Sequence, residues 1–329
     1  MGTQAICAFC DDKEPDENFV NHTNNFSYKG VTPHFNEEDL IQEESPLSFR
    51  FRPSGIDYSK IISDFGIIKW SNNSIFKGYF KNNIPNGWGI YFHHTNGTFQ
   101  GEYYNDQPNG FGIFIHENDS TYIGYWKNER QDGFGEEKWP EGMQYLGEFS
   151  MGKKNGIGRY TFPNGNIYYG EWEQNLMNGF GIYLFDQCRI YIGEWLNGLK
   201  DGYGEIYGQN NNYFFGYFRN NSQNGFFLFY NDKTGKIIVG YNTNGKVDGI
   251  AKYFFPESEG RILILSNGHK IKEIKNLEDL EKSQDDNDIK YKRQLNKYYY
   301  MNREEIEEIL KQKIKSENYN ELMELLKSK

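Results

Sequence analysis

The sequence predicts an all-β protein, an elongated single-layer antiparallel meander of β-hairpin repeats with a short α-helical C-terminal segment. The first observation is a series of glycines that recur 23 residues apart six times and then 24 residues apart, which marks eight units. A second glycine stands nine residues after each of these anchors. Aromatic residues, 18% of the chain, alternate around the anchors as in strands. The anchors are Gly78, Gly101, Gly124, Gly147, Gly170, Gly193, Gly216 and Gly240.

Each unit is predicted to be one hairpin. Tyr122, Gly124 and Trp126 alternate with other residues along the chain, so a strand places them on one face. The polar residues 128–132 are predicted to form the hairpin loop, and residues 163–165 to form a turn into the next unit. Consecutive hairpins must pair edge to edge, because a lone hairpin is marginally stable.

The chain divides into three parts. Residues 1–52 are rich in Asp, Glu, Asn and Pro and are predicted to be a flexible arm. Residues 53–256 form the repeat array, in which a degenerate capping unit over 53–75 precedes the eight repeats. Residues 257–329 are predicted to contain a cap strand and amphipathic helices.

The C-terminal part begins with a predicted strand and turn over residues 261–269 that would cover the open sheet edge. A first helix follows Asn302, a candidate N-cap, and a second begins at about Glu317. The first helix presents one apolar face, formed by Ile306, Ile309, Leu310 and Ile314. This face is expected to dock on the chain's own array or, alternatively, to receive a partner helix.

The extreme N-terminus carries a candidate lipidation site. Gly2 would become available for myristoylation after removal of Met1, and Cys7 and Cys10 are near enough for S-palmitoylation. Two acyl chains anchor stably, whereas one binds weakly. Ile6 stands where Ser or Thr is usual, so an unmodified start is the alternative.

A zinc site that combines Cys7 and Cys10 with His22 and His34 is disfavoured, since the histidines lack the short spacing of zinc ligands.

Charge and composition exclude several classes. The net charge of −10 argues against a nucleic-acid binder. Residues 76–236 hold 13 Lys and Arg and 17 Asp and Glu, so 13 − 17 = −4, with no basic excess for anionic lipid. The sequence contains no apolar run of about 18 residues and no secretory signal. With three cysteines, an intracellular protein is expected.

No motif for catalysis or for a cofactor is found. The Gly-x-Gly tripeptides recur as repeat punctuation and do not open a helix, so they do not indicate a phosphate loop. His93 and His94 are adjacent and would point to opposite faces of a strand. We therefore expect no enzyme activity, no metal and no cofactor.

The pattern Tyr-x-Gly-x-Trp followed by Gly-x-Gly, seen from Tyr168 to Gly181 and from Tyr191 to Gly204, resembles the MORN repeat. The resemblance implies a non-catalytic intracellular scaffold that ties membranes, cytoskeleton or axonemal structures to partner proteins and in some cases binds phosphoinositides. The expected location is the cytoplasmic face of a membrane or the cytoskeleton. The alternatives are a radial-spoke-like component of a cilium or axoneme without a lipid anchor, and a regulatory subunit of a phosphoinositide enzyme.

Partner binding is assigned to the aromatic face of the first strands, where a peptide or helix could lie in a groove. The alternative is that these rings pack on one another between repeats. The candidate residues are Tyr122, Trp126, Tyr145, Phe149, Tyr168, Trp172, Tyr191 and Trp195.

Overall fold

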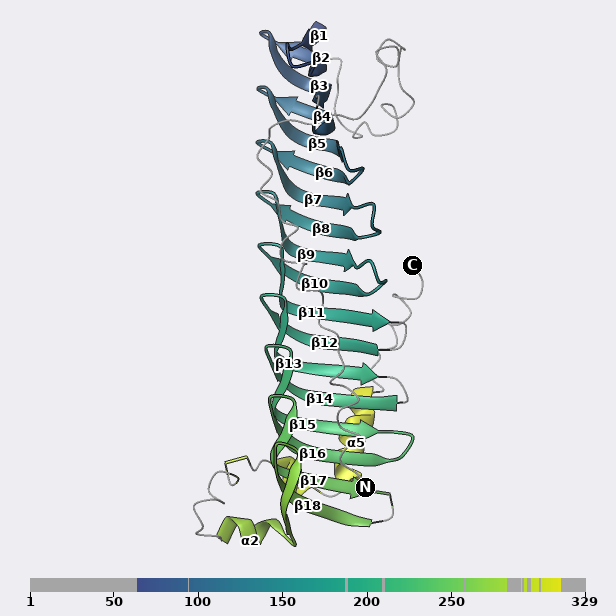
Figure 1. The fold of residues 1–329 in the computed structure, drawn as a ribbon, viewed down its shortest axis with the longest axis vertical. Helices are drawn as coiled ribbons and strands as arrows, with labels where there is room; N and C mark the ends of the chain where they lie inside the picture. Colours follow the sequence, from purple (N-terminus) through teal and green to yellow (C-terminus); the bar gives the residue numbers. More distant parts are fainter. Residues whose placement is uncertain are drawn as a thin grey trace. The chain divides into compact units, whose positions relative to one another are not determined.

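The structure, a computed structural model, describes residues 64–93, 95–186, 189–208, 211–256, 258–282, 291, 293–294, 297–301 and 303–314. The described residues fall into two compact units, an N-terminal unit that ends at Gly179 and a C-terminal unit that begins at Phe180. Within each unit the strands pair antiparallel with their neighbours in sequence. The predicted all-β antiparallel meander is confirmed (Figure 1).

Strands account for nearly all regular structure in the N-terminal unit, and β11 (Leu176–Asp186) crosses its boundary. The strands before β11 are β1 (Asp64–Lys69), β2 (Ile75–Lys81), β3 (Ile84–His93), β4 (Gly97–Tyr104), β5 (Gln107–His116), β6 (Thr121–Lys127), β7 (Arg130–Lys138), β8 (Gln144–Ser150), β9 (Lys153–Thr161) and β10 (Ile167–Glu173).

The C-terminal unit continues the hairpin pattern and adds short helices. Its strands are β12 (Arg189–Leu196), β13 (Leu199–Gly208), β14 (Asn212–Arg219), β15 (Ser222–Asn231), β16 (Lys236–Thr243), β17 (Lys246–Phe255), β18 (Ser258–Ser266) and β19 (His269–Ile274). Its helices are α2 (Leu277–Lys282), α4 (Lys297–Tyr300) and α5 (Arg303–Ile314). No helix in the described ranges is long and apolar enough to cross a membrane.

The register places glycines opposite glycines. Gly124 of β6 pairs with Gly135 of β7, which in turn pairs with Gly147 of β8. We call the sheet face that carries these glycines and the rings two residues to either side of each anchor, such as Tyr122, the ring face. The opposite face carries the residues between them, such as Ile123.

The hairpin turns are shorter than predicted. Asn128 and Glu129 both have positive φ, 49° and 67°, and β7 begins directly after them. This is the conformation of a two-residue type I′ turn, whose twist suits flanking strands. The predicted five-residue loop over 128–132 is therefore wrong, because its last three residues belong to β7. The predicted turn at 163–165 is confirmed, since Gly165 has a φ of 83°.

The C-terminal helices dock on the sheet of their own unit. Ile306 and Leu310 of α5 and Tyr299 of α4 are all fully buried in a core with strand residues of the C-terminal unit. The expectation that the first helix docks on the chain's own array is confirmed. A strand is present where the cap strand was predicted, because β18 pairs with β17. The prediction that it covers the sheet edge is wrong, because β19 follows and pairs with the other side of β18. Asn302 and the predicted helix from Glu317 lie outside the described residues.

Candidate partner-binding surface

On the ring face, pairs of facing glycines leave space in which an aromatic ring packs against the backbone. We call each such space a glycine slot. Gly147 and Gly158 lie opposite each other, and the Tyr145 ring lies across both. A Cβ on Gly158 would stand 2.4 Å from the Tyr145 ring, so any larger residue would displace it. The Tyr145 hydroxyl donates a hydrogen bond of 2.9 Å to the Glu148 carbonyl. Burial, and next the Glu148 carboxylate, raises the pKa of Tyr145, which keeps this donor protonated.

The slots of successive units interlock. The Tyr145 ring meets Phe149 at 5.0 Å and Trp172 of the next unit at 5.3 Å, both edge to face. The indole N–H of Trp172 donates to the Gly158 carbonyl at 3.2 Å. Edge-to-face pairs contribute beyond the area that they bury. Each ring therefore joins two units.

The eight aromatic residues predicted to line a partner groove lie in this packed interior. None exposes more than 7% of its surface. The rings pack over the glycine pairs and against one another, so these eight side chains present almost no surface to a partner. The structure thus supports the alternative, that the rings pack on one another. Their exposed fractions are Tyr122 0%, Trp126 7%, Tyr145 0%, Phe149 4%, Tyr168 0%, Trp172 2%, Tyr191 0% and Trp195 4%.

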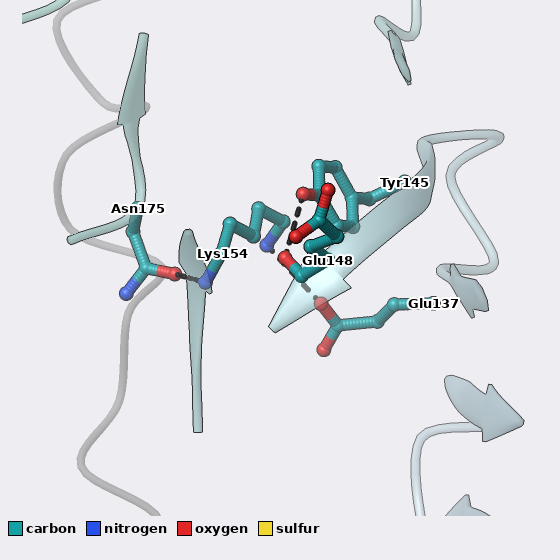
Figure 2. A network of polar contacts seen from close by, with 5 residues as sticks. All are labelled: Glu137, Tyr145, Glu148, Lys154 and Asn175. Carbon is teal, nitrogen blue, oxygen red and sulfur yellow. Dashed lines mark hydrogen bonds and ion pairs between the residues drawn. The ribbon is translucent and has the colours of Figure 1, made fainter. Parts of the chain in front are cut away.

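A buried ion pair between Lys154 and Glu137 lies beside the Tyr145 ring (Figure 2). The Lys154 ammonium is 3.1 Å from the Glu137 carboxylate, and both side chains are 11% exposed. The ammonium also lies 4.9 Å from the Trp139 ring centroid and 5.2 Å from that of Tyr145. The Asn175 side chain accepts a hydrogen bond of 2.8 Å from the Lys154 backbone N–H.

The burial of Lys154 was not predicted from the sequence. The sequence did contain an indication of a structural role, because a lysine recurs at the same repeat position. Lys200 stands 46 residues after Lys154, which is two repeat periods, and is also buried.

The opposite face of the N-terminal unit is exposed and apolar. Its exposed residues come from both strands of successive hairpins, and sequence reasoning had not assigned them a role. Contiguous exposed apolar side chains on a soluble protein mark interaction surfaces. They are Tyr125 52%, Phe134 54%, Leu146 37%, Ile157 44% and Tyr169 49%.

Charged side chains are interspersed with these apolar side chains. One is basic, since Arg159 lies opposite both Leu146 and Tyr169, and others are carboxylates. Glu148 lies opposite Phe134, and Glu171 lies opposite Ile157. The register shifts at Gly147, and a Glu148 oxygen accepts a hydrogen bond of 3.3 Å from the Ile157 N–H. In the equivalent position of an earlier repeat, burial raises the pKa of Glu102, against the opposing effect of its bond from a backbone N–H.

The remaining predicted sites are distributed as follows. Gly2, Cys7 and Cys10 lie outside the described residues. Within the described part of the chain, no group of three or more His, Cys, Asp or Glu side chains is placed to hold a metal ion.

A family model of the MORN repeat matches residues 99–121, 122–144, 145–167, 168–187 and 191–213. Each match begins at or just before a ring that fills a glycine slot, such as Tyr145. A search of curated proteins finds no match. MORN repeats are non-enzymatic modules that interact with proteins or membranes.

Proposed function

Because the chain is a MORN-repeat protein through these five consecutive units, we propose that it is a non-catalytic scaffold that binds partner proteins along its repeat array and attaches to a membrane through N-terminal acylation. The observation that carries this proposal is the exposed apolar surface on the opposite face of the N-terminal unit. The aromatic side chains of the ring face are buried against one another, so the opposite face is the one available to partners.

A scaffold suits this architecture better than an enzyme does. Catalysis needs several titratable groups that converge on one partly dry pocket. Here three carboxylates of the opposite face, Glu102, Glu148 and Glu171, hold the same repeat position on the separate strands β4, β8 and β10.

Membrane attachment rests on the sequence of the first ten residues. Acylation of Gly2 with palmitoylation of Cys7 or Cys10 would supply the two chains that stable anchoring needs. The proposed location is the cytoplasmic face of a membrane or the associated cytoskeleton. The array itself lacks the basic excess that would bind anionic lipid, including phosphoinositides, without such an anchor.

Two measurements test the proposal. Cross-linking in cells, followed by mass spectrometry, should join partner proteins to residues 76–256, and recovery of no cross-linked partner there would contradict the scaffold. Labelling with an alkyne myristate analogue should mark the wild-type chain, and Gly2→Ala should lose the label and leave the membrane fraction. A Gly2→Ala chain that partitions like wild type would refute the lipid anchor.

A further inference from the structure

The C-terminal unit shows how the opposite face receives a helix. Phe226 stacks on Tyr298 with ring centroids 5.3 Å apart. The Tyr299 hydroxyl donates to the Ile250 carbonyl at 2.9 Å, and the Lys252 ammonium donates to the Tyr299 carbonyl at 2.7 Å. Ile306 of α5 completes the buried cluster. An apolar stripe on a helical segment thus packs against the residues of this face.

The same repeat positions lie uncovered in the N-terminal unit. Val239 and Leu146 each precede an anchor glycine, yet Val239 is 0% exposed and Leu146 is 37% exposed. Ile250 and Ile157 each follow the second glycine, and they are 0% and 44% exposed. Phe134 occupies the position of Phe226, and it is 54% exposed. In the C-terminal unit the helices cover this face around Phe226, Val239 and Ile250. Phe180 and Tyr217 of the same unit are 53% and 49% exposed, so the cover is local. The described part of the chain leaves the equivalent positions of the N-terminal unit accessible.

Charge distinguishes the two versions of this face. Where the helices cover this face in the C-terminal unit, the cross-strand pairs beside the second glycine are uncharged, as in Phe226 with Tyr241 and Ile250 with Ile264. In the N-terminal unit the corresponding pairs include acids. Three such pairs each join one carboxylate to one apolar side chain, namely Trp88 with Glu102, Phe134 with Glu148, and Ile157 with Glu171.

The charge pattern argues against a helix like α5 as the occupant. That helix carries four glutamates and three basic residues among its twelve residues, a net charge of −1 (3 − 4 = −1). It therefore offers no excess of positive charge to Glu148 and Glu171. A helix with lysine or arginine beside its apolar stripe would meet these carboxylates with opposite charge.

We propose that the opposite face of the N-terminal unit, over residues 111–171, binds an amphipathic α-helix of a partner protein, with a basic flank set against Glu148 and Glu171. This inference rests on the proposed scaffold function and specifies the chemistry of the partner. From β5 to β10 the face spans five strand spacings of about 4.8 Å, or about 24 Å. A helix of about 16 residues matches that length.

The test uses the full chain and two synthetic labelled peptides of about 18 residues. Both carry leucine at i, i+3, i+4 and i+7; one carries lysine and arginine beside this stripe, and the other carries glutamate. Fluorescence anisotropy should show binding of the basic peptide and at least about tenfold weaker binding of the acidic one. Equal affinity for the two peptides, or no binding of the basic one, would overturn the proposal.

Substitutions locate the binding. Glu148→Gln with Glu171→Gln keeps the hydrogen-bond acceptors and should erase most of the preference for the basic peptide. Leu146→Gln with Ile157→Gln should weaken both peptides by about tenfold or more. Met151→Gln is the matched control, since Met151 is 63% exposed but lies in a turn outside this surface. The Met151→Gln chain should bind both peptides with the same affinity as the wild-type chain. If both double variants bind the two peptides with the affinities of the wild type, the assignment of binding to this face is refuted.

Cross-linking of the full chain identifies competing occupants. Cross-links from residues 1–63 or 315–329 of the same chain to this face, or from a second, isotopically labelled copy, would overturn the proposal in favour of the segment found there. Failure of the peptide assay with partner cross-links still present elsewhere on the array would reject this inference alone. Absence of any partner on the array would reject the scaffold itself.

Discussion

Replacing Lys154 by Met, with Glu137 left in place, should weaken the N-terminal unit locally by about 3 to 5 kcal/mol. The two charged groups are 3.1 Å apart and almost fully buried. At an effective dielectric constant of about 20 their attraction amounts to about 5 kcal/mol. The desolvation of two ions offsets much of this gain. Removing the ammonium abolishes the attraction and leaves the carboxylate buried, which is why the single substitution is costly.

The repeat itself provides the matched control. Met177 stands 23 residues after Lys154 and is 3% exposed, and Tyr160 stands 23 residues after Glu137 and is 2% exposed. Lys154→Met combined with Glu137→Tyr therefore reproduces a pair of residues that the next unit already buries. We expect this double variant to lie within about 1 kcal/mol of wild type, because no uncompensated charge remains. Methionine also keeps contact with the Trp139 ring.

Native-state hydrogen exchange of the amides in β7, β8 and β9 measures the local opening free energy of each variant. It suits a repeat array, where stability is a sum over neighbouring units and one global value is ill defined. A single Lys154→Met substitution that changes exchange by less than about 1 kcal/mol would show that the pair is well hydrated despite its burial. A double variant as unstable as the single one would show that packing, and not charge, determines the loss.

Three further results are expected. Gly158→Ala should cost about 1 to 3 kcal/mol by exchange in β8 and β9, because its Cβ meets the Tyr145 ring at 2.4 Å; Gly66→Ala, with a first contact at 3.2 Å, is the tolerated control. Glu129→Gly should stabilise its hairpin by about 1 kcal/mol, since Glu129 has a φ of 67°, and no slowing of hydrogen exchange in β6 and β7 would contradict the turn geometry. Burial lowers the pKa of His116 to about 4, below its value of about 6.5 in the unfolded chain. The stability that the neutral imidazole contributes is therefore full above about pH 6.5 and is lost as the pH falls towards 4. His116→Asn should reduce the dependence of the unfolding free energy on pH in this range, and an unchanged dependence would assign it to other groups.

Much of the fold follows from the sequence because the repeat multiplies each local signal. The glycine period predicted the hairpins, and the alternation around Gly124 predicted that Tyr122 and Trp126 share a face. The turn length was not predictable from polarity, since Gln131 and Asp132 are polar yet lie in β7. The better indicator in the sequence was Asn128 at the first turn position, because Asn readily adopts the positive φ that a two-residue turn requires.

The binding surface was harder to predict, because both faces of the strands carry large apolar residues. Tyr122 and Ile123 are adjacent and apolar, and periodicity of two alone does not say which is covered. The deciding feature is the glycine column, which lets rings such as Tyr122 lie flat on the sheet and bury one another. The face without glycines has no such slot, so Ile123 and its equivalents depend on another element for cover.

The two faces of the repeat have different roles, which explains how the same repeat can bind the chain's own helices in one unit and leave an exposed surface in the other. The ring face tolerates little variation, since a Cβ at Gly124 or Gly135 would fall within 2.5 Å of its neighbours. The opposite face varies more freely. Ile250 and Phe226 contact the chain's own helical segment there, whereas Glu148 and Glu171 add charge between exposed apolar side chains. Exposed differences between repeats therefore lie on the opposite face, as with Glu148 and Tyr125, which each follow an anchor glycine. Under the proposed scaffold function, partner specificity would come from these exposed residues rather than from the regular spacing of rings and glycines.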